Sequence, residues 1–415
     1  MTKPPTAFDV AWARQSYAQV RAHSLALTRT LSPEDQSVQS MPDASPTKWH
    51  LGHTTWFFET LLLGAFQPGY VPYDARLAYL FNSYYEALGP RHERASRGVL
   101  TRPSLEDVLA YRQHVDTAVD NLLAAIRPAD SAAVLDTLVL GLNHEQQHQE
   151  LLVTDIVHAF SRNPLLPAFA PARGLLEGSQ QPTAGAEWLS HPGGIVDIGH
   201  QGATFAFDNE RPRHQVLLRP FAVADRLVTN GEYLAFIEDG GYRRPEFWLS
   251  DGWATLRANE WRAPGYWMRH DELPIPSLQG KKSEWLTFGI DGLRPLDHGD
   301  AVTHLSFYEA AAYAQWAGAR LPTEFEWEAA AMRPGMRQIA DRAWQWTRSS
   351  YEPYPGFRPH AGAAAEYNGK FMVGQLVLRG GSIATPAGHA RPTYRNFFPA
   401  NTRWQITGLR LARDA

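Results

Sequence analysis

The sequence predicts a multidomain protein in which an all-α half, folded as a four-helix bundle, precedes an α+β half. The chain has 415 residues, which is more than one hydrophobic core usually serves. Apolar side chains recur with helical spacing over residues 9–160, whereas short strand-like runs and glycine-rich loops follow from about residue 188. We expect a helical domain over residues 1–162, a linker over 163–187 and a second domain over 188–415.

Each helix of the first half has a start signal or an apolar stripe. Ser104 and Asp107 have the spacing of a capping box, and Ser45-Pro46-Thr47 precedes an apolar segment. The expected helices span residues 9–31, 49–66, 104–126 and 130–160. Because two of the three connections are short or moderate and one is long, at about 67–103, the pattern is typical of a four-helix bundle.

The rest of the chain has a different residue composition and a different hydrophobic pattern. Residues 163–187 are rich in Pro, Ala and Gly, as linkers are. Strand-like runs at 194–198 and 215–218 follow, and one clear helix is expected at 306–318. This half is therefore predicted to be α+β, with much irregular structure.

Composition excludes several classes of function. The net charge of -4 gives no reason to expect a nucleic acid or an anionic membrane as a partner. There is no stretch of about eighteen apolar residues and no signal-peptide core, so we expect a cytoplasmic protein. The sequence contains no cysteine, so any metal must bind nitrogen or oxygen. The oligomeric state stays open.

The strongest motif is His144-x-x-x-His148-x-Glu150 on the fourth expected helix. Residues four apart share a helix face, so both imidazoles can point at one metal ion. A third histidine from the second helix, His50 or His53, would complete three ligands and leave positions open. The simpler alternative is a pair of buried histidines that are hydrogen-bonded to backbone or carboxylate groups.

Four ordered motifs in the second half resemble a known family. They are Val228-Thr229-Asn230-Gly231-Glu232-Tyr233, the segment 320–330 beginning Arg320-Leu321-Pro322-Thr323-Glu324, Val377-Leu378-Arg379-Gly380-Gly381-Ser382 and Thr407-Gly408-Leu409-Arg410-Leu411. Together they resemble the sulfatase-modifying-factor domain, a C-type-lectin-like α+β fold found in formylglycine-generating enzymes. The first half resembles a DinB-like bundle. Their fusion resembles the ergothioneine-synthesising sulfoxide synthases, including the closely similar selenoneine synthases.

The resemblance implies an oxidoreductase of the hercynine oxygenase type with Fe(II) as its cofactor. It would use O2 to join a thiol to the imidazole C2 of hercynine and oxidise the sulfur to a sulfoxide. Three imidazoles with open positions suit Fe(II). Zinc would also bind them but has no redox chemistry, and the residues alone do not separate the two metals.

The resemblance also assigns the ligands and one neighbour. His53, His144 and His148 would hold the iron, because the family's first ligand closes the Trp-x-Leu-x-His pattern, and His50 would lie outside that set or at the surface. Gln147 would contact hercynine. Glu150 and Asp155 are expected either to orient a ligand imidazole or to be ordinary solvated acids.

Two further groups are assigned to the reacting partners. Tyr84 or Tyr85 would be the catalytic phenol that supplies a proton, as in the branch of the family that uses free cysteine. Arg94 and Arg97 resemble the arginines that hold the carboxylate of the thiol substrate. The plainer alternatives are two packing aromatics and a solvated basic run.

The segment Tyr394-Arg395-Asn396-Phe397-Phe398 resembles the loop that brings the second domain to the iron. Asn396 would bond hercynine, and Phe397 and Phe398 would enclose its quaternary ammonium. Since Phe398 stands where the glutamylcysteine-using branch has an acidic residue, we expect L-cysteine as the thiol. Ile383 replaces a cysteine found in many relatives, without an evident reason. Formylglycine-generating activity, which needs two copper-binding cysteines, is excluded.

Two alternatives stay open. The first keeps the fold and iron but attaches a seleno-sugar, so that a selenol replaces the thiol. In that case Arg94 and Arg97 would have no carboxylate to hold. The second is a non-catalytic binding module with a closed structural zinc site, in which Tyr84, Tyr85 and Asn396 have no chemical role.

Overall fold

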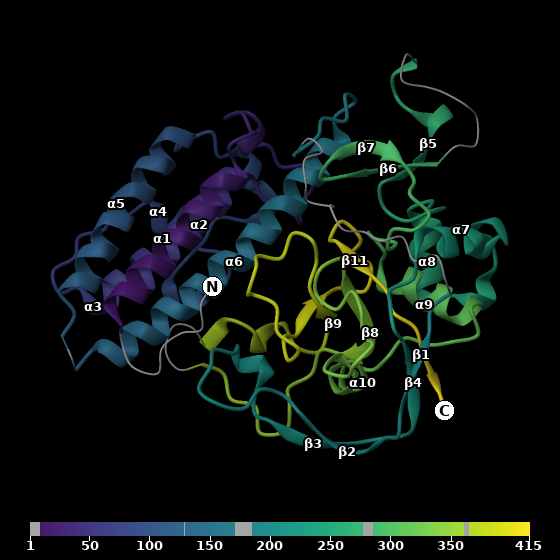
Figure 1. Ribbon diagram of the computed structural model, residues 1–415. Coiled ribbons are helices and arrows are strands. Elements are labelled where there is room, and N and C mark those ends of the chain that lie inside the picture. The colour runs from purple at the N-terminus through teal and green to yellow at the C-terminus, as the bar shows by residue number, and fades with distance from the viewer. Residues whose placement is uncertain (1–8, 128, 171–184, 277–284, 361–364) are drawn as a thin grey trace.

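The computed structural model describes residues 9–127, 129–170, 185–276, 285–360 and 365–415, and it places a helical bundle beside a region of small sheets and short helices (Figure 1). The four expected helices are confirmed. They are α1 (Val10–Leu27), α2 (Thr47–Phe57), α5 (Leu105–Ala124) and α6 (Ser131–Arg162). The helix α2 continues through a π-helical turn, Phe58–Leu63, into α3 (Gly64–Phe66).

Side-chain caps explain where two of these helices start. The Asp9 carboxylate accepts hydrogen bonds from the backbone of Ala11 and Trp12. Ser104 and Asp107 form the expected capping box at the start of α5. Each cap satisfies backbone N–H groups that have no partner within the helix.

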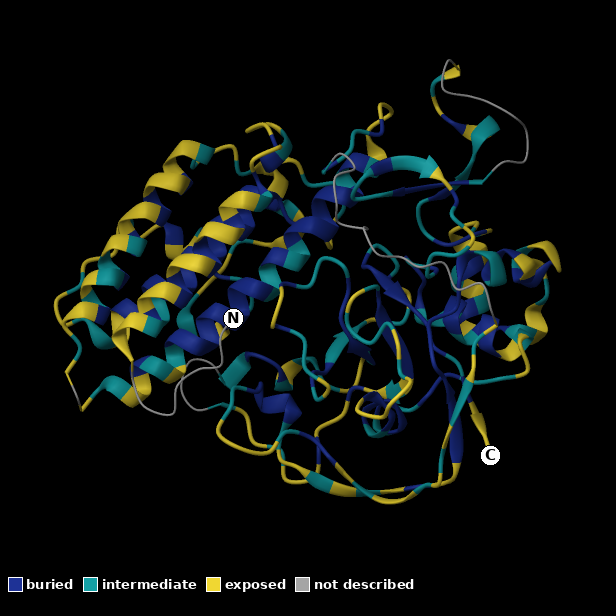
Figure 2. Ribbon diagram, viewed as in Figure 1, coloured by how far each residue is buried: buried dark blue, intermediate teal, exposed yellow. Residues whose placement is uncertain are grey.

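The helix α6 lies between the rest of the bundle and the second half of the chain (Figure 1). Residues 138–146 of α6 are buried without interruption, whereas α1 and α5 show exposed outer faces (Figure 2). A helix that is buried on all sides must have neighbours on all sides. Side chains of α6 can therefore reach both the bundle interior and the second half.

The long connection between the bundle helices is partly helical. It contains α4 (Leu77–Phe81) and two 3-10 segments, Glu86–Leu88 and Arg94–Val99. Phe81 packs against α2 at Gly52, where an added Cβ would lie 2.3 Å from the ring. The absence of a side chain at Gly52 is what allows this connection to approach α2 so closely.

The described residues of the second half form four small sheets. The strands are β1 (Trp188–His191), β2 (Gly194–Ile198), β3 (His214–Leu218), β4 (Phe221–Ala224), β5 (Trp267–Arg269), β6 (Trp285–Gly289), β7 (Gly292–Pro295), β8 (Trp344–Ser350), β9 (Leu376–Gly380), β10 (Asn396–Phe398), β11 (Thr407–Gly408) and β12 (Ala412–Asp414). They pair in the orders β1-β4-β12, β2-β3, β5-β6-β7 and β10-β9-β8-β11. All described pairings are antiparallel except β11 with β8. The expected α+β class is confirmed.

The expectation of one clear helix in this half was too low. Besides α9 (Phe307–Trp316), the described residues form α7 (Asn230–Glu238), α8 (Ser250–Ala258) and α10 (Glu324–Ala331). Capping boxes start three of them, at Thr229, Ser306 and Thr323. Two of these boxes lie inside the family motifs, so the motifs contained the helix starts.

Part of the expected linker packs against the core. Leu166 and Phe169 are buried in a cluster with the end of α6 and with strand β6. Residues 171–184 of that segment lie outside the described part of the chain. Among the described helices, no helix has both the length and the apolar character needed to cross a membrane.

Candidate metal centre

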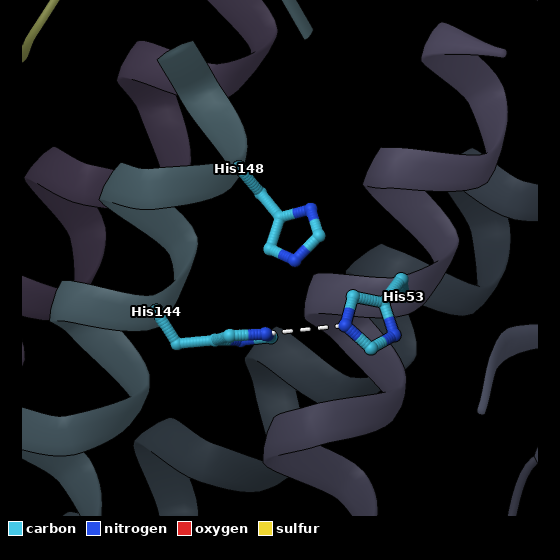
Figure 3. A group of neighbouring side chains, drawn as sticks. All are labelled: His53, His144 and His148. Carbon is cyan, nitrogen blue, oxygen red and sulfur yellow. Dashed lines mark hydrogen bonds between the residues drawn. The ribbon is translucent and has the colours of Figure 1, made fainter. Parts of the chain in front are cut away.

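Three histidines on two helices of the bundle converge on one point (Figure 3). His53 lies on α2, and His144 and His148 lie one turn apart on α6. One nitrogen of each ring lies within 4.8 Å of the others, and the His53 and His144 Nε2 atoms are 3.1 Å apart. Two nitrogens bound side by side to one metal at about 2.1 Å are separated by about 3 Å, so the arrangement fits a single ion.

The hydrogen bonds of the other ring nitrogens show which nitrogen of each histidine is available to a metal. The Nδ1 of His53 lies 2.6 Å from the Phe81 carbonyl oxygen and donates to it, which leaves the Nε2 lone pair free. The Nδ1 of His148 lies 2.9 Å from the Nδ1 of His50. The buried Nδ1 of His144 has no hydrogen-bond partner among the described residues. The Nε2 atom of each of the three histidines is therefore available to bind a metal.

His50 is neither a ligand in this arrangement nor a surface residue. It is 3% exposed, and its Nε2 lies 3.1 Å from Oδ2 of Asp155. Asp155 thus reaches a ligand only through His50. Glu150 contacts no ligand; instead it accepts hydrogen bonds from Trp344, Ser382 and Thr385 of the second half.

Burial keeps the three imidazoles neutral. It lowers the pKa of His53 and His148 well below the ordinary histidine value, and it lowers the pKa of His144 to about 3. Aromatic rings pack against the ligands: His53 stacks between Trp49 and Trp56, and His144 stacks on Phe57 at 4.3 Å. Neutral imidazoles are ready to bind a divalent metal without first losing protons.

Gln147 links the ligand helix to the second half. Its Nε2 donates to the Tyr394 hydroxyl at 2.6 Å, and its Oε1 accepts from the Tyr367 hydroxyl. The Tyr367 ring lies edge-on to His144, with 5.7 Å between centroids. Sequence reasoning missed Tyr367, because a single tyrosine in a loop about 220 residues from its partner Gln147 carries no local pattern.

Comparisons with known proteins agree with this two-part arrangement. The DinB superfamily model matches residues 16–152. The sulfatase-modifying factor enzyme 1-like domain model matches residues 174–338 and 332–415. The chain is also 32% identical to a formylglycine-generating enzyme of Streptomyces coelicolor, over 37% of this chain and 48% of that protein.

Two relatives match both halves together. A hercynine oxygenase of Mycolicibacterium smegmatis is 31% identical, over 91% of this chain and 92% of that protein. The chain belongs to the hercynine oxygenase family. A hercynine oxygenase of Mycobacterium tuberculosis is 30% identical over 96% of this chain and 97% of its own length. The expected family is confirmed, and so is the expectation of an enzyme of the oxygenase class.

In this member of the hercynine oxygenase family the two expected phenols lie side by side. The Tyr84 and Tyr85 rings stack at 4.7 Å, and Tyr85 packs on Trp56 and Phe57, which themselves contact ligands. The Tyr85 hydroxyl is buried and makes no well-formed hydrogen bond to any described side chain or backbone group. Burial raises the pKa of both phenols well above the ordinary tyrosine value, so both keep their protons at neutral pH.

The two expected arginines have different surroundings. Arg97 is buried; its guanidinium lies 3.3 Å from the centre of the Trp49 ring, and it donates to the hydroxyls of Ser45 and Ser83. Among the described residues it forms no ion pair with a carboxylate; the Asp155 carboxylate acts on it only at longer range, and burial lowers its pKa to about 8. Arg94 is exposed and donates to the backbone carbonyl of Asp43.

The expected second-domain loop, residues 394–398, contains strand β10 and reaches the bundle through the hydrogen bond of Tyr394 with Gln147 and through aromatic contacts that begin at Phe397. Phe397 stacks on Tyr351 at 4.0 Å and lies 5.9 Å from Phe371, whose ring meets Tyr84 edge-on at 5.1 Å. Asn396 accepts a hydrogen bond from the backbone of Phe397. Phe398 is half-buried and packs against the main core.

Proposed function

We propose that this chain is an O2-dependent iron(II) enzyme that joins the imidazole C2 of hercynine to a thiol, L-cysteine, with oxidation of the sulfur to a sulfoxide. The observation that carries the proposal is the convergence of three neutral imidazoles on one point, in a chain of the hercynine oxygenase family. Iron(II) would supply the activation of O2, which zinc cannot. The proposal places the enzyme in the cytoplasm.

Gln147 and its two tyrosine partners are the proposed recognition site for hercynine. The Gln147 amide lies beside the ligand His148 and is fixed at both ends, by Tyr367 and by Tyr394. A fixed amide can orient a substrate imidazole, because its donor and acceptor point in set directions. Asn396, Phe397 and Phe398 complete the proposed site, with aromatic faces for the quaternary ammonium.

The proton donor is proposed to be one of three phenols. Tyr84 and Tyr85 are the pair expected from the sequence, and Tyr367 joins them because its ring contacts His144. Burial raises the pKa of Tyr367 well above the ordinary tyrosine value. Each phenol therefore holds a proton that it can donate at neutral pH.

Arg97 is the proposed anchor for the carboxylate of the sulfur donor. A buried guanidinium without a carboxylate partner is costly, so an anionic ligand would stabilise it. Its face is already held by Trp49, which also stacks on the ligand His53. A carboxylate bound at Arg97 would therefore sit beside the metal centre.

One observation favours a seleno-sugar as the alternative donor. Only Arg97 of the two expected arginines is buried near the ligands; Arg94 is exposed and is bonded to a backbone carbonyl. A pair of arginines that grips one carboxylate is therefore absent from the described arrangement. A sugar selenol, which carries hydroxyls rather than a carboxylate, would need no such pair.

The test is anaerobic reconstitution with Fe(II), followed by hercynine, O2 and either L-cysteine, γ-glutamylcysteine or a seleno-sugar. Mass spectrometry of the products separates the three donors. A sulfoxide formed from hercynine and L-cysteine is the expected product. Absence of any coupled product, with iron bound and hercynine present, would contradict the enzyme proposal as a whole.

The phenols are tested in the same assay by Tyr367→Phe and by the double variant Tyr84→Phe, Tyr85→Phe. Loss of a proton donor should lower kcat by about 10²-fold or more, with metal content unchanged. Whichever set leaves turnover intact is excluded as the donor. If both sets retain full turnover, the phenol assignment is wrong.

A further inference from the structure

The three proposed ligands differ in the hydrogen-bond partner of Nδ1, the ring nitrogen that does not face the metal. His53 donates to a neutral backbone carbonyl, that of Phe81. His144 has no hydrogen-bond partner for its Nδ1 within the described ranges. His148 alone is linked to an acid, because its Nδ1 meets His50, and His50 in turn meets Asp155.

The direction of these bonds follows from chemistry. The Asp155 carboxylate can only accept, so His50 must donate to it from Nε2. A neutral His50 then has a lone pair at Nδ1, which accepts a hydrogen bond from the Nδ1–H group of His148. His148 is left with its lone pair on Nε2, the nitrogen that faces the other two ligands (Figure 3).

The hydrogen-bonded series Asp155–His50–His148, here called the relay, is buried, and a further hydrogen bond holds Asp155 at its far end. His50 and Asp155 are 3% and 5% exposed. Oδ2 of Asp155 also accepts a hydrogen bond from the backbone N–H of Ser45 at 2.8 Å. Water has little access to either side chain, so the histidine cannot exchange this partner for solvent.

We propose that Asp155 and His50 are positioning residues that act through His148. They fix its tautomer and ring orientation. They also make its Nε2 a stronger electron-pair donor to the metal than the Nε2 of His53 or His144. The inference rests on the proposed metal centre but concerns residues that do not touch the metal. Carboxylates and carbonyls commonly hold ligand histidines directly; here a second histidine is interposed.

The relay also lies close to Arg97, the proposed anchor for the carboxylate of the sulfur donor. The backbone of Ser45 holds Asp155, while the Ser45 hydroxyl accepts a hydrogen bond from Arg97 at 2.9 Å. Ser45 therefore contacts both the far end of the relay, at Asp155, and the proposed anchor Arg97. One serine connects the groups that would hold the donor with the groups that position a metal ligand.

Cobalt(II) binding to the metal-free protein tests the proposal without turnover. The variants are Asp155→Asn, which keeps the shape and removes the charge, and His50→Leu, which breaks the relay. His50→Gln is the conservative variant, since an amide can both donate and accept. His158→Gln is the matched control, because His158 is a buried histidine on the same helix whose ring bonds Ser40 and not a ligand.

We expect Asp155→Asn and His50→Leu to weaken cobalt binding by about 10- to 100-fold and to shift the visible cobalt spectrum. His50→Gln should recover part of the affinity, and His158→Gln should change neither quantity. Circular dichroism establishes that each variant is folded, and if His50→Leu does not fold, Asp155→Asn decides. Folded Asp155→Asn protein with the affinity and spectrum of the parent would overturn the proposal.

Failure of the relay and failure of the proposed function give different results. If the parent protein binds no cobalt, or binds it without the three histidines, the proposed metal centre is wrong. If the parent binds cobalt through the three histidines and Asp155→Asn binds it equally well, only the relay is wrong. The substitution His144→Ala in the parent identifies the site in either case.

Discussion

Gln147 donates a hydrogen bond to the Tyr394 hydroxyl at 2.6 Å, and this bond joins the ligand helix α6 to the second half of the chain. Because Gln147 precedes the ligand His148, any movement of the second half relative to α6 is transmitted to the neighbourhood of the metal. The same amide accepts from Tyr367. Gln147 therefore contacts two tyrosines of the second half from a position next to His148.

Gln147→Leu should raise the KM for hercynine by about tenfold or more while metal content stays at the parent level. The substitution removes both amide contacts but leaves the three imidazoles in place. Loss of binding that is equal in the ground and transition states raises KM without lowering kcat. Steady-state kinetics and metal analysis check this outcome, and Tyr394→Phe, which removes one hydroxyl, should show a smaller effect in the same direction.

Gly52→Ala should destabilise the protein and weaken metal binding together. A methyl group at position 52 would lie 2.3 Å from the Phe81 ring, and the Phe81 carbonyl is the group that orients His53. Overpacking of this kind costs about 1–3 kcal/mol. Urea denaturation of the metal-free protein and a cobalt titration measure the two effects.

The matched control is Gly64→Ala, whose added methyl group would meet no closer atom than a carbonyl oxygen at 3.5 Å. Both glycines lie on the same helical segment, so their helix propensities change alike. Gly64→Ala should therefore leave the cobalt affinity nearly unchanged and should not lower the free energy of unfolding. Equal behaviour of the two variants would show that the Gly52–Phe81 contact does not position His53.

The sequence contained enough to predict the bundle and the His144–His148 pair, because both have local periodicity, whereas the third histidine was assigned to His53 only through the family resemblance. His144 and His148 are one helical turn apart, and Ser104 and Asp107 carry a complete capping box. Contacts between the halves had no such pattern. Glu150 has the spacing expected of a residue that orients a ligand, yet its carboxylate is used by Ser382 and Thr385, more than 200 residues away.

His50 illustrates the same limit at short range. Its spacing of three from His53 left two candidates for one ligand position, since neighbours at three residues also share a helix face. Tertiary contacts decide between them. The Phe81 carbonyl holds His53 with Nε2 toward the other ligands, whereas Asp155 draws His50 toward the end of α6.

Glu150→Ala should lower the free energy of unfolding by about 2–4 kcal/mol, because it removes the acceptor of two buried donors, on Trp344 and Ser382, and of the half-buried Thr385 hydroxyl. Oε1 accepts from the Trp344 indole at 2.8 Å and from the Ser382 hydroxyl at 2.5 Å, and Oε2 accepts from Thr385 at 2.7 Å. Glu150→Gln should cost less, since its amide oxygen still accepts and the hydroxyls can turn. Chemical denaturation ranks the variants; equal stability of Glu150→Ala and the parent would refute this account of the contact.

The metal-free protein should lose stability as the pH falls from 6.5 toward 4, and His158 should supply part of that loss. Burial, with a smaller contribution from Arg162, lowers the pKa of folded His158 to about 4, although Asp155 acts in the opposite direction. In the unfolded chain His158 binds a proton below about pH 6.5, whereas in the folded chain it stays neutral until about pH 4. Acid therefore favours unfolding, and this loss of stability is absent above about pH 6.5. For one such histidine the difference in unfolding free energy between pH 7 and pH 5 is about 2 kcal/mol. His158→Gln should therefore reduce the difference measured by urea denaturation at pH 7 and pH 5 by about that amount, whatever it does to stability at pH 7. An unchanged pH difference in this variant would mean that His158 is protonated in the folded protein as readily as in the unfolded chain.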